Sequence, residues 1–460
     1  MSVQQFLSRG RTTDEAYELG RDLRRTLRRG EQAEVVLGQR DLIATIERTH
    51  VGRIPELISV RVSRMLHSPY AFFRGTVDVM TRDLAAGPVS GVHVVIDSDA
   101  HLGNFGLYAS PERRLVFDLN DFDEAGIGPW EWDVKRMATS QALVLREKGV
   151  STADQVEHIE LAIRRYQDSL AELVRSAALE RFFASVDAQW LLDEGTPTFQ
   201  RSVDKAQRRT SEQALFNLGV RGDDGKLALK AEPPLLIPHP PGSLERSRRR
   251  FEEYRHTLHT DRALVLSQFE LVDVARRVVG VSSVGTHCSI ALLQGPNQEP
   301  LILQAKEAVS SVLEREGGLT DVVLPGSPQG GAGRESYRVV SSQRVLQSVS
   351  HPFLGWTGDP DGRNYYWRQF RDLKGSFDLA RADVDELKRY AGLCAQQLAR
   401  AHAQSPDAAA VAGYLGSSAT FATAVGRWAV AYADVVEKDF AQFQEAVADG
   451  RLTAAEDGQY

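Results

Sequence analysis

Two short stretches rich in acidic side chains constrain this chain more than any other feature of its sequence. The first covers residues 97–106 (DSDAHLGNFG) and the second covers residues 117–124 (FDLNDFDE). Apolar runs at 92–96 and 115–117 lead into them, and such runs between polar turns are typical of buried strands. Carboxylates gathered at strand ends repel each other unless a cation or a proton lies between them. The simplest interpretation is a metal site with a catalytic base beside it.

The composition narrows the class of protein and of partners. With 460 residues, the chain is long enough for two or three core-bearing units. Its formal net charge of -7 disfavours nucleic-acid binding. The two cysteines, Cys288 and Cys394, lie far apart, so we expect no disulfide framework and a reducing, cytoplasmic location. No apolar run approaches the ~18 residues of a membrane span, so we expect no membrane association.

The pattern of apolar and polar residues predicts an α+β fold in four parts. We expect an N-terminal helical segment (1–50), a helical large lobe carrying the acidic stretches (51–260), a small β-rich lobe (261–375) and C-terminal helices that complete the large lobe (376–460). Within the small lobe, the predicted order is strand, Gly-rich loop, strand, strand, helix, strand, strand. The predicted elements are strands at 274–279, 287–294 and 301–306, a helix at 334–349, and a hairpin of 353–356 with 365–370.

The spacing of polar residues in the two stretches predicts phosphoryl-transfer chemistry. Asp99 and Asn104 stand five residues apart, as in kinase catalytic loops, where the aspartate deprotonates the acceptor hydroxyl and the asparagine binds a metal ion. Asp121 begins an Asp-Phe-Asp sequence at a strand-to-loop corner, where a kinase aspartate holds the metal that bridges the nucleotide phosphates. We therefore expect Asp99 to be the base and Asn104 and Asp121 to be metal ligands. Asp123 would bind a second metal or only hydrogen-bond the loop.

A Gly-rich loop and a lysine further along the chain predict a nucleotide site. Residues 280–286 read Gly-x-Ser-x-x-Gly-Thr between two strands, a near match to the loop that covers ATP phosphates in kinases. Lys306 ends the third strand, where a kinase lysine holds the α- and β-phosphates, although a strand lysine can also simply face solvent. Alternation along this strand separates Lys306 from the apolar face made by Leu301 and Leu303. The expected nucleotide-binding residues are Gly280, Ser282, Ser283, Gly285, Thr286 and Lys306.

Several further residues are expected to support this centre. The arginine Arg74 precedes it in sequence and would either bind phosphate or neutralise the carboxylates. Glu335 and Gln343 are candidates for the helix residue that pairs with Lys306. For Asp97 and Asp118, the alternative is a carboxylate that caps backbone amides at a strand end. The remaining supporting residues are His101 and Glu124.

These residues carry a resemblance to two known groups of proteins. The segments 99–104, 121–125 and 128–133 resemble the aminoglycoside and choline phosphotransferase branch of the kinase-like fold. That resemblance implies that Asp133 is a buried structural residue at the start of a helix. Most of the chain is also similar to a bacterial family catalogued as domain of unknown function 2252 (DUF2252), a resemblance that implies no substrate. It rests on residues 68–75, 99–106, 117–124, 130–136, 306–308 and 398–403.

The chain departs from the kinase-like pattern in composition and in order. Ser98 and Ser282 stand where that pattern has glycines, which would alter the approach of the backbone to a nucleotide. In kinases the Gly-rich loop and the lysine precede the catalytic loop, whereas here the acidic stretches come first. We therefore expect a circularly permuted, two-lobe kinase-like fold. This hypothesis requires Lys306 to lie within ~10 Å of Asp121, allowing for lobe opening.

The function expected from these features is ATP-dependent phosphotransfer to a hydroxyl group of an unknown small molecule or protein. ATP would be the co-substrate and Mg²⁺ or Mn²⁺ the cofactor. One alternative is a kinase-like pseudoenzyme or a nucleotidyl transferase. A second alternative is a two-metal hydrolase. It would use Asp97, Asp99, His101, Asp118, Asp121 and Asp123.

Overall fold

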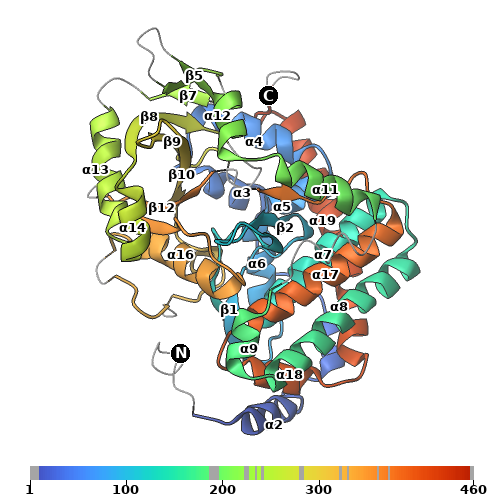
Figure 1. Cartoon of the computed structure of the whole chain (residues 1–460). Helices are drawn as coiled ribbons and strands as arrows, with labels where there is room; N and C mark the ends of the chain where they lie inside the picture. Colours follow the sequence, from blue (N-terminus) through green and yellow to red (C-terminus); the bar gives the residue numbers. More distant parts are fainter. Residues whose placement is uncertain are drawn as a thin grey trace.

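The fold joins a helical body to an antiparallel sheet, with short central strands between them (Figure 1). The computed structural model describes residues 10–185, 196–221, 227–233, 236–239, 243–278, 284–320, 324–328, 331–359, 362–370 and 373–455. Helices and antiparallel sheets both contribute, which confirms the predicted mixed α+β class.

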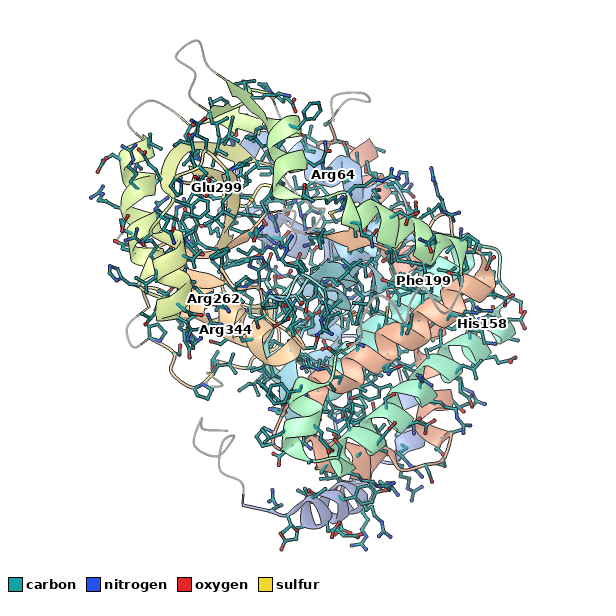
Figure 2. All side chains as sticks on the ribbon, in the orientation of Figure 1. Arg64, His158, Phe199, Arg262, Glu299 and Arg344 are labelled. Carbon is teal, nitrogen blue, oxygen red and sulfur yellow. The ribbon has the colours of Figure 1, made fainter. Side chains whose placement is uncertain are left out.

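Amphipathic helices that pack around one apolar core form the helical body. Helix α8 packs against α17 and α19, and α18 packs against α2. The buried positions of α8 recur at helical spacing, which gives it one apolar face. Phe199 of α11 (labelled in Figure 2) packs against Phe377 and Tyr390, and so joins α11 to α17. The bounds are α2 (Thr13–Leu23), α7 (Trp130–Glu147), α8 (Thr152–Arg175), α11 (Pro197–Gln207), α17 (Val384–His402), α18 (Ala408–Leu415) and α19 (Thr420–Ala448).

Short central strands bring the two acidic stretches together. Strand β1 (His93–Ile96) pairs antiparallel with β4 (Gly126–Pro129), and β2 (Phe105–Ala109) lies between β3 (Leu115–Leu119) and β13 (Gly375–Ser376). A Cβ atom at Gly106 of β2 would lie 2.3 Å from the carbonyl oxygen of Gly375, so the close approach of β13 requires glycine there. The first stretch therefore runs from the end of β1 into β2, and the second begins within β3 and continues beyond its end.

The small lobe contains a six-stranded antiparallel sheet in the order β11-β12-β10-β9-β8-β7. Helices α13 and α14 cover one face of it, and α16 packs against β11 and β12. The predicted order of strands and helix is confirmed, as is the alternation along β10. Residues 280–283 of the predicted Gly-rich loop lie outside the described residues. The edge strand β7 comes from the proline-rich segment before residue 261, where an edge position tolerates Pro238. The bounds are β7 (Leu236–Pro238), β8 (Glu270–Arg277), β9 (Cys288–Gln294), β10 (Pro300–Ala308), β11 (Gly355–Gly358), β12 (Asn364–Gln369), α13 (Ser243–Arg255), α14 (Thr260–Leu266) and α16 (Arg334–Leu346).

The remaining elements connect these layers. Within the predicted N-terminal helical segment (1–50), the described residues form α2, a 3₁₀ turn and α3, because β-branched residues and Gly38 interrupt the helix before Asp41 caps α3. The other elements are η1 (Arg29–Ala33), α3 (Leu42–His50), η2 (Pro55–Leu57), α4 (Ile58–Met65), α5 (Pro69–Arg74), α6 (Val77–Ala86), η3 (Leu102–Asn104), α9 (Ala178–Phe183), α12 (Ser211–Leu218), β5 (Gly219–Arg221), β6 (Leu227–Leu229) and α15 (Val312–Arg315).

Among the residues that the structure describes, no single helix is both long and apolar enough to cross a bilayer. Helices α18 and α19 meet the length and composition criterion only as a pair, across a 91° bend. Both helices contribute residues to the central core.

Candidate functional site

Asp133, in the first turn of α7, holds the backbone that carries the first acidic stretch. Its Oδ2 and Oδ1 accept hydrogen bonds from the backbone N–H groups of Asp97 and Ser98, each at 2.7 Å. His402 Nε2 lies 3.2 Å from Oδ2, and the hydroxyl group of Tyr166 hydrogen-bonds the other ring nitrogen, Nδ1. All of these side chains are buried. Asp133 therefore positions the loop that presents Asp99.

Asp99 is fixed by an arginine from one turn further along the same helix. Arg136 donates to Asp99 Oδ1 from Nε at 2.9 Å and from Nη2 at 2.7 Å. Burial raises the pKa of Asp99 to about 7, although Arg136 pulls it down. The other oxygen, Oδ2, lies 3.8 Å from the imidazole Nε2 of His101. Arg136 thus anchors one oxygen of this carboxylate and leaves the other without a guanidinium partner. Asp99 also lines a cleft.

Asn104 and His101 complete the first stretch. The Asn104 side-chain nitrogen donates to the backbone carbonyl oxygen of Asp99 at 2.8 Å, which directs the amide oxygen away from that bond. Burial lowers the pKa of His101 well below its usual value, and the charges of Arg74 and Arg136 act in the same direction. His101 is therefore a neutral imidazole. Arg74, at the end of α5, is close enough to influence it electrostatically.

The amide-capping interpretation describes Asp118 but not Asp97. Asp118 Oδ2 accepts from the Ser348 backbone N–H at 2.7 Å and Oδ1 accepts from its neighbour Leu119 at 2.9 Å. Neither carboxylate oxygen of Asp97 has a hydrogen-bond partner among the described residues, and both are buried. Burial raises the pKa of Asp97 well above its usual value, and the charges of Asp133 and Asp99 add to this. Asp97 is therefore a buried carboxyl group without a hydrogen-bond partner among the described residues, two positions before Asp99.

Lys306 of β10 reaches across from the sheet to the second acidic stretch. Its Nζ lies 3.4 Å from Asp121 Oδ1, and it also contacts Asp123 Oδ2 directly. Tyr366 of β12, the register partner of Lys306, donates to Asp123 Oδ1 at 2.7 Å. Burial opposes the lysine charge, but the two aspartates outweigh it and raise the pKa of Lys306. Residues 185 positions apart in sequence thus meet at one point.

The two aspartates respond to this environment in opposite directions. Burial favours the neutral form of both. For Asp121, the charges of Lys306 and Arg368 outweigh burial and lower the pKa. For Asp123, burial and the neighbouring Asp121 outweigh Lys306 and raise the pKa. Of the two carboxyl groups, Asp121 therefore ionises more readily and is the better anionic ligand.

The helix of the small lobe contacts the acidic loop through an arginine. Arg338 of α16 donates to the carbonyl oxygens of Asp123 and Ala125 at 2.8 and 2.7 Å. Glu335, a candidate partner of Lys306, bonds Arg338 instead. The other candidate, Gln343, donates to Gln347 at 2.9 Å. Within the described chain, the structure places neither candidate on Lys306.

Glu124 and the end of the Gly-rich loop border the cleft. Glu124 Oε2 accepts from the Val312 N–H at 2.6 Å, which fixes the start of α15. Thr286 lines the cleft together with Asp99, Asn104, Asp121 and Asp123. The carbonyl oxygen of Gly285 accepts from Ile54 N–H at 2.8 Å. Gly280, Ser282 and Ser283 lie outside the described residues.

The donor set suits a hard cation that is shared with a phosphorylated ligand. Among the described residues, no group of three or more His, Cys, Asp or Glu side chains is arranged to hold a metal by itself. Mg²⁺ needs only one or two protein carboxylates where phosphates and water supply the other ligands. Asp121, the Asn104 amide oxygen and the orphaned Asp97 fit that requirement. Asp118, which the hydrolase alternative needs, already bonds two backbone amides.

Sequence reasoning missed three residues that shape this site. Arg136 could have been found from its helical spacing to Asp133, which places both on neighbouring turns of α7. Tyr366 and Arg338 had no local signal, because their importance depends on strand register and on the rotation of α16. All three anchor an acidic residue or its backbone.

The comparisons with known proteins give one family. A family model described as "Uncharacterized protein conserved in bacteria (DUF2252)" matches residues 53–446, well over half of the chain. The matched region contains both acidic stretches, the sheet and α17. No match was found among curated proteins or among solved structures.

Proposed function

The chain belongs to the DUF2252 family of bacterial proteins, and we propose that it is an ATP-dependent phosphotransferase with a circularly permuted kinase-like fold. The acceptor would be a hydroxyl group of a small molecule or a protein. The observation that carries the proposal is the 3.4 Å contact between Lys306 and Asp121. The permutation hypothesis requires these two residues to lie within ~10 Å of each other, and no local sequence pattern forces them together.

The arrangement of elements supports the same proposal. The sheet offers strands β8, β9 and β10, then α16, then β11 and β12, with the lysine on the third of these strands. In kinases the lysine likewise lies on the third strand and a helix follows it. Helix α17 comes after the sheet, and its last residue, His402, contacts Asp133 beneath the catalytic loop. This order is the one expected of a kinase-like chain in which the small lobe and the helix that follows it come after the catalytic loop instead of before it.

The residues of the first stretch would handle the proton. Asp99 accepts the proton of the acceptor hydroxyl as the acceptor oxygen bonds to the γ-phosphorus and the bond to the leaving ADP oxygen breaks. A pKa of about 7 lets this carboxylate take up and release a proton near neutrality. Arg136 fixes one oxygen, so the carboxylate keeps its orientation during the transfer.

The residues of the second stretch would bind charge. Asp121 and Asn104 would hold Mg²⁺ or Mn²⁺, which when bound neutralises phosphate charge. Lys306 would exchange its contacts with Asp121 and Asp123 for phosphate oxygens. The cleft bordered by these residues has a volume of only about 50 Å³, far below the 300–1,000 Å³ of typical small-molecule sites. Nucleotide binding therefore requires the sheet to move away from the helical body.

Binding of Mg-ATP to an Asp121→Asn variant tests this proposal. At an ATP concentration 100 times the Kd, wild type should gain about 2.7 kcal/mol of stability from ligand binding. Asp121→Asn should lose affinity about 100-fold, because the metal loses its anionic ligand, and its thermal shift should nearly vanish. The measurement is the melting temperature with and without Mg-ATP, followed by mass analysis of products from labelled ATP.

Asp118→Asn is the matched control. This substitution changes the same residue type in the same stretch. Because Asp118 bonds only backbone amides, the Kd of the variant for Mg-ATP should stay within about twofold of wild type. Equal nucleotide affinity in wild type and Asp121→Asn would refute the assignment of Asp121. Absence of Mg-ATP binding in wild type would refute the phosphotransferase proposal itself.

A further inference from the structure

A second, larger cavity adjoins the acidic cleft. It has a volume of about 460 Å³, which falls within the range of small-molecule sites. Thr286, Glu124 and Val77 line both cavities, so a molecule in the larger one would reach the cleft of Asp99. The lining is strongly basic, with five arginines against three carboxylates. The arginines are Arg48, Arg53, Arg61, Arg315 and Arg363.

Three of these arginines are already neutralised by carboxylates. Arg315 contacts Asp78 at 2.9 Å and Glu124 at 3.2 Å. Arg363 contacts Glu307 at 2.8 Å. The third, Arg48, contacts Glu316 at 3.6 Å. These three arginines therefore already have carboxylate partners within the protein.

The other two arginines bond only neutral groups among the described residues. Arg53 donates to the carbonyl oxygens of Thr49 at 2.6 Å and Val284 at 2.5 Å. Arg61 donates to the carbonyl oxygen of Gly75 at 2.6 Å, and its Nη1 lies 3.1 Å from His50. Arg61 is only 2% exposed, and its buried Nε has no hydrogen-bond partner in the described chain. A buried cation without a carboxylate partner is costly to the fold.

The pKa shifts around Arg53 and Arg61 also indicate positive charge that no carboxylate neutralises. Burial lowers the pKa of Arg61 to about 9, and the charge of Arg53 lowers it further. Burial and both arginines also lower the pKa of His50 to about 4, so the imidazole adds no charge at neutral pH. Two guanidinium groups that repel each other beside an open cavity suit a dianionic ligand. Guanidinium groups bind phosphate through paired hydrogen bonds.

We propose that Arg53 and Arg61 bind a phosphomonoester group of the acceptor, so that the substrate is a phosphorylated, hydroxyl-bearing small molecule. This inference rests on the phosphotransferase proposed above and names its substrate class. A phosphate dianion matches two unneutralised arginines better than a single carboxylate does. With its phosphate in the arginine cavity, such a molecule extends past Thr286 and presents a hydroxyl to Asp99.

The test is calorimetric titration of the full chain with inorganic phosphate, without nucleotide. Arg53→Met and Arg61→Met should each weaken phosphate binding at least tenfold, and acetate should bind wild type at least tenfold more weakly than phosphate. Arg64→Met is the matched control, because Arg64 (labelled in Figure 2) lies on the same helix, α4, but does not line the cavity. It should change the phosphate Kd less than twofold.

Two further measurements keep the result interpretable. Arg61→Lys retains the charge but not the fork of donors, so it should fold where Arg61→Met fails and still bind phosphate several-fold more weakly. Phosphate binding should persist in Asp121→Asn and in the presence of saturating Mg-ADP. Displacement of phosphate by Mg-ADP, or equal affinity in the arginine variants and wild type, would overturn the acceptor site. Intact Mg-ATP binding without phosphate binding would overturn it alone, leaving the phosphotransferase proposal standing.

Discussion

The two halves of the candidate site hold their charges in different ways. On the helical-body side, Asp133 is fully buried and bonds two backbone amides and His402 within one packed layer. In the half that faces the sheet, just after β3, Asp121 and Asp123 keep 30% and 27% of their side chains exposed and bond Lys306 of β10 across the cleft. Bonds within one layer survive any movement of the sheet, whereas bonds across the cleft must break when it opens. The first half is therefore a scaffold and the second is an exchangeable set of charges.

Asp133→Asn should give the largest effect on stability. The substitution leaves one backbone amide facing an NH₂ group in a fully buried site, and it removes the charge that strengthens both bonds. We expect a loss of about 3 kcal/mol in the free energy of unfolding, measured by urea denaturation. Asp434→Asn is the control, because it removes only a surface ion pair with Arg146 and should cost less than about 1 kcal/mol. Equal effects at the two positions would break the comparison.

The same substitution in the half that faces the sheet, Asp123→Asn, should change stability by less than about 1 kcal/mol. It removes an ion pair with Lys306, but it also removes one of two carboxylates that repel each other, and the amide oxygen still accepts from Tyr366. A loss of about 3 kcal/mol, measured by the same urea denaturation, would show that this half is also a scaffold.

The pH dependence of that variant sharpens the distinction. Burial and Asp121 raise the pKa of Asp123 in the folded chain, so the folded protein binds more protons at this group than the unfolded chain does. Its contribution to stability therefore falls as the pH rises from its ordinary pKa of 3.8 through the raised value. Because Asn lacks that fall, the stability of Asp123→Asn relative to wild type should increase between pH 4 and pH 7. A constant difference would contradict the assigned direction.

Much of the site could be predicted because its chemistry is local in sequence. Asp99 with Asn104, and Asp121 with Asp123, are close in the chain. Both pairs lie where short strands end, which brings the two pairs near each other. Lys306 was also predictable, since alternation along β10 separates it from the apolar face. The permutation hypothesis also required Lys306 to lie near Asp121, but the direct contacts of Lys306 with Asp121 and Asp123 were not predictable, because pairing across the cleft depends on how two layers dock. Glu335 illustrates the limit: the sequence gives its place on α16 but not the rotation that directs Arg338 to the acidic loop.

Ser98→Gly is the smallest of these changes and tests the strain within the scaffold half. Ser98 has a φ of 67°, in the left-handed region that favours glycine, and its buried hydroxyl has no partner among the described residues. Relief of the backbone strain exceeds the entropy that glycine loses on folding, so we expect a gain of about 0.5–1 kcal/mol. Ser98→Ala removes the hydroxyl but keeps the Cβ atom, so the difference between the two variants in urea denaturation isolates the backbone term. If the variants are equally stable, the bonds of Asp133 to this loop hold it without strain. If only glycine stabilises, the loop of Asp99 is held in a strained backbone conformation at Ser98. The bonds made by Asp133 and Arg136 must then offset that strain.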